Sequence, residues 1–388
     1  MSRGIFLGIR RFLLIFLASI FLSLHYASTL FVNSSFLGKF FSPSGISFFF
    51  ILGAVASIIL FIKVPVLLNR WSKRGLFLTF LTLEAISMTG LALATTGISA
   101  GFFFIIYFAS LPILYYLLDI FLEDISLNEK TGEIRGLYLT FMNASIALGP
   151  LFVAGLVLQD NFTAVYLLAL ALLGPIYIAF LFFPSLGQSK KKHEHFSKIH
   201  FHQWLKNINI RRVTLVRFVL NFFYALMTIF TPIYLRSVLG FEWSEIGIIF
   251  TIMLLPFVIF EWPMGELGDR YFGEKEIMTL GLFIMGTALL LMPFLDKNFT
   301  LWASVLFLSR IGASWVEIST ESYFFKKVES NDTGLISIFR LTSPVSTVFG
   351  AFLGGLIIYL LPFNLIFFFI AFAVLLGMKE SLFIHDTR

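Results

Sequence analysis

The chain has 388 residues, a formal net charge of +6 and no cysteine, and 58% of its residues are hydrophobic, including 51 Phe. Its mean hydropathy is +0.92 and only 13% of its residues are charged, so it has more apolar surface than a soluble domain can bury. The absence of cysteine excludes disulfides, thiolate metal sites and cysteine nucleophiles. Apolar runs of about 20 residues recur without strict alternation, which fits membrane-spanning helices and not a β-barrel. The composition therefore predicts an all-α polytopic membrane protein.

Twelve apolar spans are predicted along the chain, and most of them are joined by short connections. The exception is the segment 184–211, a predicted cytoplasmic linker between an N-terminal six-helix bundle at 1–183 and a C-terminal one at 212–388. The predicted spans are 12–33, 46–68, 75–97, 101–122, 136–158, 163–183, 212–235, 246–265, 276–295, 301–325, 335–359 and 363–378.

The distribution of Lys and Arg predicts the orientation of these spans, because the cytoplasmic loops of membrane proteins are enriched in both residues. If the N-terminus is inside, 22 of the 28 cations fall in cytoplasmic segments, whereas only Lys39, Arg236 and Lys297 fall in external loops. We therefore expect a multi-pass protein of the plasma (inner) membrane with both termini in the cytoplasm.

An internal repeat relates the two halves. The dipeptide Thr-Gly occurs at 131–132 and again at 333–334, and Leu-Thr occurs at 139–140 and again at 341–342, both at an offset of 202 residues. Each match is weak alone, but their agreement on one offset predicts a duplicated six-span unit and hence two pseudo-symmetric bundles.

A charged, glycine-containing turn follows the eighth span, from Gly265 to Lys275. Gly265, Asp269, Arg270 and Gly273 resemble the loop motif of the major facilitator superfamily, G-x-x-x-D-R-x-G-[RK]-[RK], with one extra residue before Gly273. A degraded copy lies 200 residues earlier, with Pro, Asn and Ser in place of Gly, Asp and Gly. The resemblance covers nearly the whole chain. It implies two six-helix bundles that rock about a midplane site, and transport without a cofactor.

In that family the charges of the loop motif latch the cytoplasmic gate, so the resemblance implies a gate here too. Asp119 and Glu321 correspond across the repeat and lie in the last turn before the cytoplasmic face. They are expected to pair with loop-motif arginines rather than to bind substrate. Because Asn69 brings no charge, the latch of the first half should be the weaker one. The implied gate residues are Asn69, Arg70, Asp119, Gly265, Asp269, Arg270, Gly273 and Glu321.

Polar side chains form stripes on several spans, although an ionisable group at the centre of a membrane helix costs at least about 2.5–3.5 kcal/mol. The tenth span carries such a stripe from Arg310 to Glu321, and the seventh carries another from Arg217 to Thr231, both at helical spacing. The resemblance implies that spans 1, 4, 7 and 10 line the central cavity. The other interpretation is that Arg310 and Glu317 only neutralise charges on neighbouring helices. The candidate substrate and coupling residues are His25, Tyr115, Arg217, Asn221, Tyr224, Arg310, Ser314 and Glu317.

Two further patterns have a structural and a functional interpretation. Gly149, Pro150 and Gly155 partly resemble the antiporter motif of the same family, but close helix packing is the favoured explanation. The linker holds four of the six histidines, and a basic segment lying on anionic headgroups is favoured over a metal site. No metal site is predicted.

The expected function is secondary active transport of a small molecule by alternating access. A proton is the expected coupling ion, with Glu317 as its binding group. Export of an amphipathic compound is the preferred direction, and the alternatives are a nutrient uptake permease or a transport-inactive receptor or scaffold of the same fold. No motif for ATP hydrolysis, acyl-enzyme formation or zinc peptidase chemistry occurs, so the chain is not expected to be an enzyme. The expected partners are a small-molecule substrate, a proton and the lipid bilayer, without nucleic acid, and the chain is expected to be a monomer.

Overall fold

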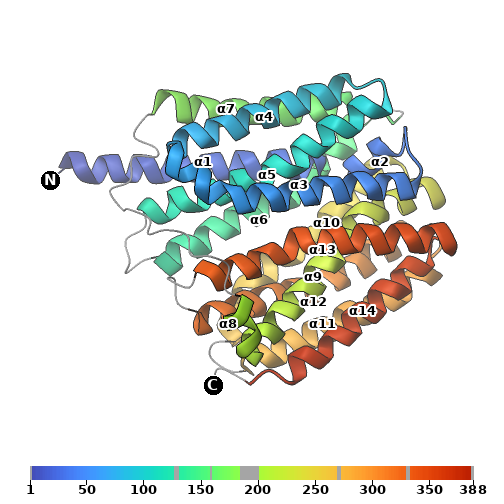
Figure 1. The fold of residues 1–388 in the computed structure, drawn as a ribbon. Coiled ribbons are helices and arrows are strands. Elements are labelled where there is room, and N and C mark those ends of the chain that lie inside the picture. The colour runs from blue at the N-terminus through green and yellow to red at the C-terminus, as the bar shows by residue number, and fades with distance from the viewer. Residues whose placement is uncertain are drawn as a thin grey trace. The chain divides into compact units, whose positions relative to one another are not determined.

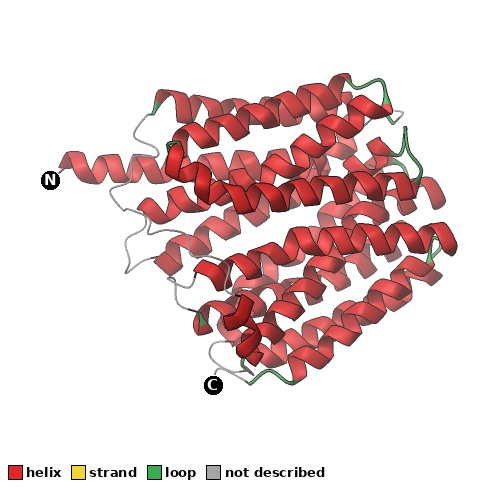
Figure 2. Cartoon of the chain, in the orientation of Figure 1, coloured by secondary structure: helices red, strands yellow, loops and turns green. Residues whose placement is uncertain are grey.

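The computed structural model describes residues 2–125, 131–157, 160–183, 201–268, 272–328 and 333–385, and every regular element in these ranges is a helix (Figures 1 and 2). Within the same ranges, 11 helices are long and apolar enough to cross a membrane, and a shorter apolar segment, Thr140–Leu156, lies in a further helix. The predicted all-α polytopic membrane fold is therefore confirmed.

The helices of the first half correspond to the first six predicted spans. The short α2 is an addition, and it follows α1 after a turn within the first predicted span. The bounds are α1 Ser2–Leu30, α2 Asn33–Leu37, α3 Pro43–Arg70, α4 Lys73–Leu93, α5 Gly97–Ile125, α6 Thr131–Leu156 and α7 Thr163–Phe182.

The second half follows the same order after the short helix α8. A π-helical turn, η2, continues α9, and a 3-10 turn, η4, ends α11. The bounds are α8 Phe201–Lys206, α9 Ile208–Ile233, η2 Tyr234–Val238, α10 Trp243–Leu267, α11 Glu274–Leu291, η4 Met292–Phe294, α12 Phe299–Lys327, α13 Thr333–Leu360 and α14 Leu365–Leu382.

The chain divides into two compact units. The first comprises Met1–Phe40 and Leu52–Glu194, and the second comprises Phe41–Ile51 and His195–Arg388. The division after Glu194 falls within the segment that the sequence predicts as a linker, whereas the beginning of α3 belongs to the second unit.

The same helix packing occurs in both units. In the first, α1 packs against α5, α6 and α7, and α4 packs against α5 and α7. In the second, α9 packs against α12, α13 and α14, and α11 packs against α12 and α14. Both α5 and α12 are 29 residues long, and α6 and α13 begin at the repeated Thr131 and Thr333. The repeat in the sequence is thus reproduced in the arrangement of the helices.

Side-chain caps define where several helices begin. Asn207 accepts a hydrogen bond from the backbone N–H of Ile210 at 3.2 Å, and Asn298 accepts one from Leu301 at 3.0 Å. Each cap satisfies a backbone N–H group that has no partner inside its helix. These two caps set the register of α9 and α12, which carry most of the polar residues described below.

Glycines allow close approach of helices in both units. A Cβ atom at Gly149 of α6 would collide with Ala27 of α1, and one at Gly354 of α13 would collide with Leu226 of α9. In contrast, a Cβ at Gly155 would meet no atom within 4 Å. Small residues commonly serve this purpose between membrane helices. The contact of Gly149 therefore agrees with the packing interpretation of the partial antiporter motif.

Candidate functional site

The second unit holds a cluster of ionisable side chains on α9, α12 and α13. Nη2 of Arg217 on α9 donates to Oε1 of Glu317 on α12 at 3.0 Å, and the hydroxyl of Tyr224 donates to Oε2 of the same carboxylate at 2.7 Å. Arg217 and Tyr224 are seven residues apart, so both project from one face of α9. The two oxygens of Glu317 are therefore both bound by α9.

The cluster continues to Glu321, one turn further along α12. Oε1 of Glu321 lies 3.3 Å from Nη2 of Arg217 and accepts a hydrogen bond from Nη1 of Arg340 on α13 at 2.9 Å. The guanidinium of Arg217 also lies over the ring of Phe339, at 5.6 Å from the centroid. We call Arg217, Tyr224, Glu317, Glu321 and Arg340 the charged cluster.

Charges within the charged cluster are balanced, with two guanidinium groups and two carboxylates. This balance matters because an unpaired charge inside a membrane protein is costly, whereas a hydrogen-bonded pair is tolerated. The side chain of Arg217 is 11% exposed and that of Glu317 is 28% exposed. Glu317 is thus an intramembrane carboxylate that solvent can still reach.

Arg310 behaves differently from Glu317, although the sequence places both on one stripe of α12. Its guanidinium lies 4.5 Å from the ring centroid of Phe223, and its Nη1 lies 3.4 Å from the hydroxyl of Ser309. The residue is only 3% exposed. Among the described residues Arg310 has no carboxylate partner. The neutralising interpretation therefore fits Glu317 but does not fit Arg310.

The two remaining predicted residues of the second unit have polar contacts of their own. Nδ2 of Asn221 donates to the hydroxyl of Thr342 at 3.0 Å, which joins α9 to α13 beside the charged cluster. The hydroxyl of Ser314 donates to the carbonyl of Ile311 in its own helix at 2.9 Å.

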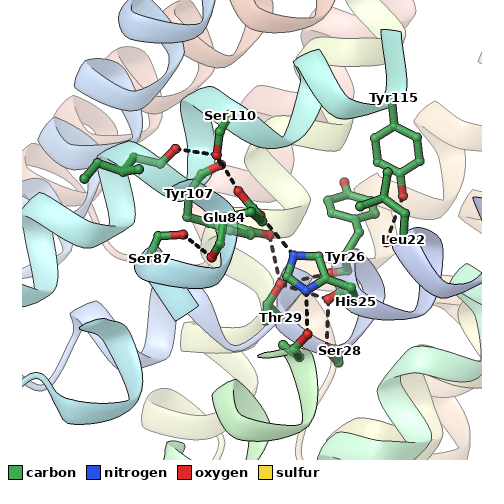
Figure 3. A network of polar contacts seen from close by, with 12 residues as sticks. Leu22, His25, Tyr26, Ser28, Thr29, Glu84, Ser87, Tyr107, Ser110 and Tyr115 are labelled. Carbon is green, nitrogen blue, oxygen red and sulfur yellow. Dashed lines mark hydrogen bonds and ion pairs between the residues drawn. The ribbon is translucent and has the colours of Figure 1, made fainter. Parts of the chain in front are cut away.

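A second polar network lies in the first unit, where His25 pairs with Glu84 (Figure 3). Nε2 of His25 lies 2.9 Å from Oε1 of Glu84, and Nδ1 lies 2.9 Å from the carbonyl oxygen of Ala169. The hydroxyl of Ser110 donates to Oε2 of Glu84. Both side chains are 0% exposed in this structure, and the role of His25 in a substrate cavity stays a prediction. Both are enclosed by partners from α1, α4, α5 and α7.

The geometry of this pair determines its proton content. Nδ1 of His25 faces a carbonyl oxygen and must donate, whereas Nε2 faces a carboxylate oxygen of Glu84. A single proton between Nε2 and Oε1 satisfies both groups, whichever of the two carries it. In either form the pair has no net charge, which suits its burial.

Two other predicted residues of the first unit lie on α5. The hydroxyl of Tyr115 lies 3.3 Å from both the carbonyl of Leu22 and the hydroxyl of Ser23, and its ring contacts that of Tyr26 edge-on (Figure 3). Asp119, one turn further along the helix, is half-buried.

The predicted gate is described in part. Gly273 has φ +85°, a backbone conformation that side chains disfavour, and its N–H donates to the carbonyl of Gly268 at 3.0 Å. The motif therefore needs glycine there, directly before α11. At Gly265 a Cβ atom would lie 3.3 Å from Ile318 on α12, and Arg70 is exposed at the end of α3. Asp269, Arg270 and the side chain of Asn69 lie outside the described residues.

The prediction that Glu321 pairs with a loop-motif arginine stays a prediction, because Arg270 lies outside the described residues. Among the residues that the structure describes, Arg217 of α9 and Arg340 of α13 contact Glu321. Both belong to helices of the second unit, and α9 packs directly against α12. Glu321 is therefore part of the charged cluster.

A metal centre has no support within the described residues, which contain no group of three or more potential ligands. Of the linker histidines, His202 is exposed in α8. The other three, His193, His195 and His200, lie outside the described residues.

Two partners in these networks are not evident from the sequence. Arg340 is one of the 22 cations counted as cytoplasmic, but it falls five residues inside the predicted span 335–359, and this position was the available signal. Glu84 lies within the predicted span 75–97, but its spacing along the chain does not identify its partner. His25 is the only histidine in any predicted span, which marks it as the natural partner of a buried carboxylate.

Comparisons with known proteins agree with this architecture. Residues 244–385 match the family model described as Major Facilitator Superfamily. No curated protein sequence matches the chain. Among solved structures, the chain is similar to the nucleoside transporter NupG, at 14% identity and a TM-score of 0.79 over 96% of this chain and 98% of that one.

Two more solved structures share the fold. The D-xylose-proton symporter is 12% identical, with a TM-score of 0.74 over 97% of both chains. A bacterial homologue of the human lysosomal transporter Spinster is 12% identical, with a TM-score of 0.71 over 97% of this chain and 93% of that one. Residues within the second half therefore match the Major Facilitator Superfamily by sequence, and nearly the whole chain shares the fold of these transporters.

Proposed function

We propose that this protein is a proton-coupled secondary transporter that moves a small molecule by alternating access. The observation that carries the proposal is Glu317, a partly exposed carboxylate within a membrane-spanning helix. One oxygen is bound by a guanidinium and the other by a phenol hydroxyl. Protonation of Glu317 would affect these two contacts differently, because only the guanidinium is charged. A carboxylate with these surroundings can exchange a proton with water, and the exchange changes its contacts with neighbouring helices.

Protonation of Glu317 would change the charge balance that holds α9 against α12. With Glu317 ionised, Arg217 has two carboxylates within reach, at 3.0 and 3.3 Å. With Glu317 neutral, the charged cluster carries one excess positive charge, and Arg217 depends on Glu321 alone. If two conformations solvate this excess charge differently, their relative populations would depend on whether Glu317 is protonated. This is the linkage that a proton-driven carrier requires.

Direction and orientation remain part of the proposal. Both termini are proposed to be cytoplasmic, on the distribution of Lys and Arg, in a chain that acts as a monomer. The loop between α10 and α11 is proposed to latch the cytoplasmic side through Asp269 and Arg270. Export loses part of its support, since Gly149 has a packing explanation.

Reconstitution into liposomes tests the proposal against its rivals. We expect solute counterflow without a gradient, and accumulation when a pH gradient is imposed. Nucleosides and D-xylose form the first panel, since the fold is shared with a nucleoside transporter and a D-xylose-proton symporter. Accumulation towards the alkaline side indicates symport, and accumulation towards the acidic side indicates the exchange expected of an exporter. A receptor or scaffold would give neither counterflow nor accumulation with any solute.

A further inference from the structure

Arg310 is a buried cation that is not part of the charged cluster. The cluster is already neutral, with Arg217 and Arg340 against Glu317 and Glu321. Arg310 lies about two helical turns from Glu317, roughly 10 Å along the axis of α12. It therefore adds one uncompensated positive charge to the membrane-spanning part of α12.

The contacts of Arg310 do not replace a counter-ion. The ring of Phe223 stabilises the guanidinium through its face, and Ser309 offers one hydroxyl at the weak distance of 3.4 Å. A guanidinium has five N–H donors and no acceptor, and a contact with a ring face uses none of them as a conventional hydrogen bond. At 3% exposure, the remaining donors have little water to bind. The arrangement is one that a carboxylate would complete, because its two oxygens match the planar fork of the guanidinium.

We propose that Arg310 binds the carboxylate of the transported solute, which is then a monocarboxylate with an aromatic or apolar body. One excess charge calls for a ligand of one negative charge, which favours a carboxylate over a phosphate. The neighbouring side chains define the rest of the ligand, since Phe223 lies against the guanidinium and the ring of Tyr224 lies tilted to that of Phe257, with 6.1 Å between the centroids. This assignment rests on the proposed transport function, and it names the class of solute.

Tyr224 links this site to the coupling carboxylate. Its hydroxyl donates to Glu317, and it also interacts electrostatically with Arg310. A solute carboxylate at Arg310 would add a negative charge to the surroundings of that hydroxyl. The charge of the solute and the proton on Glu317 are therefore coupled through one residue of α9.

Stability of the ligand-free protein gives the first test, in the Arg310→Met variant. If Arg310 is an uncompensated site, removing the buried charge should leave the unfolding temperature unchanged or raise it, by about 2–4 °C for each kcal/mol gained. A structural cation would behave in the opposite way. A loss of several degrees in Arg310→Met, with no loss in Arg236→Met, would overturn the proposal. Arg236 is a suitable control because it pairs with Glu242 at the end of η2.

Binding gives the second test, with benzoate, phenylacetate, lactate and octanoate, each beside its neutral amide, on purified wild-type protein. We expect at least one carboxylate to raise the unfolding temperature while its amide does not, since a ligand stabilises the state that binds it. Arg310→Gln should weaken that binding by at least about tenfold, Arg310→Lys should retain part of it, and Arg236→Gln should retain all of it. The proposal fails if no carboxylate binds better than its amide, or if the preference survives in Arg310→Gln.

These outcomes are independent of proton coupling. Binding through Arg310 together with normal gradient-driven accumulation in Glu317→Gln would support the solute site and refute the coupling site. Loss of accumulation in Glu317→Gln, without any Arg310-dependent carboxylate binding, would support coupling and refute the solute class.

Discussion

Glu317 differs from Glu321, the other acidic side chain of the charged cluster, in its described partners. Glu321 contacts the guanidinium groups of Arg217 and Arg340, whereas Glu317 is bound by Arg217 and by the hydroxyl of Tyr224. A guanidinium stays charged at any physiological pH, but a phenol donor can be removed by substitution without changing the charge of the cluster. Tyr224 is therefore the residue at which coupling can be altered most selectively.

Replacement of Tyr224 by Phe should reduce coupling while transport itself persists. The substitution removes a 2.7 Å hydrogen bond to an ionised acceptor, which contributes about 1.5–3 kcal/mol. A change of 1.4 kcal/mol alters the protonation balance of a carboxylate about tenfold. We expect counterflow close to that of the wild type and a clear loss of pH-driven accumulation. Tyr359→Phe is the matched control, since Tyr359 is 76% exposed on α13. Equal accumulation in both variants would show that Tyr224 has no part in coupling.

The polar stripes were accessible from the sequence, but the contacts between them were not. The stripes on α9 and α12 were evident from helical spacing, and four of their members are now known to interact directly. Which stripe residues meet depends on the rotation of one helix against another, and spacing does not contain that information. Arg310 and Glu317 therefore read as equivalent candidates, although only Glu317 lies opposite Arg217.

At the scale of helices, the pair formed by His25 and Glu84 holds the first unit together. It joins α1 to α4 and reaches α5 through Ser110 and α7 through Ala169. The sequence could place each residue in a span, but it could not show that the two spans face one another. Removal of one member would leave the other buried without its partner.

A double-mutant cycle tests this role. We expect His25→Leu and Glu84→Leu to destabilise the protein by about 3–5 kcal/mol each, since each leaves an uncompensated polar group in a 0% exposed site. The double variant should lose clearly less than the two losses combined, because it buries no orphaned group. Unfolding temperatures of purified variants provide the measurement. Strictly additive losses would mean that the two side chains act independently.

At the scale of the whole molecule, the sequence repeat and the charge distribution predict different properties. The offset of 202 residues is reproduced by the bounds of α5 and α12, so the duplicated architecture was accessible from the sequence. This prediction was possible because the length and the order of the spans follow from the hydrophobicity of successive segments of the chain. The orientation across the membrane rests on Lys and Arg alone and stays a prediction.

Labelling of single cysteines can determine that orientation, because the chain has no cysteine of its own. We expect Lys297→Cys to react with a membrane-impermeant maleimide in intact cells, since the residue lies in an exposed turn between η4 and α12. Lys191→Cys, in the linker, should react only after permeabilisation. Reaction at position 191 in intact cells would reverse the assignment.

The proposed transport depends most directly on proton coupling at Glu317, and the variant Glu317→Gln tests it. Glutamine keeps the shape and the hydrogen-bonding capacity of the side chain but cannot change charge. With a solute that the wild type accumulates, counterflow between equal concentrations should persist in liposomes, and accumulation driven by a pH gradient should disappear. If Glu317→Gln accumulates the solute as the wild type does, Glu317 is a structural member of the charged cluster, and the proton binds elsewhere.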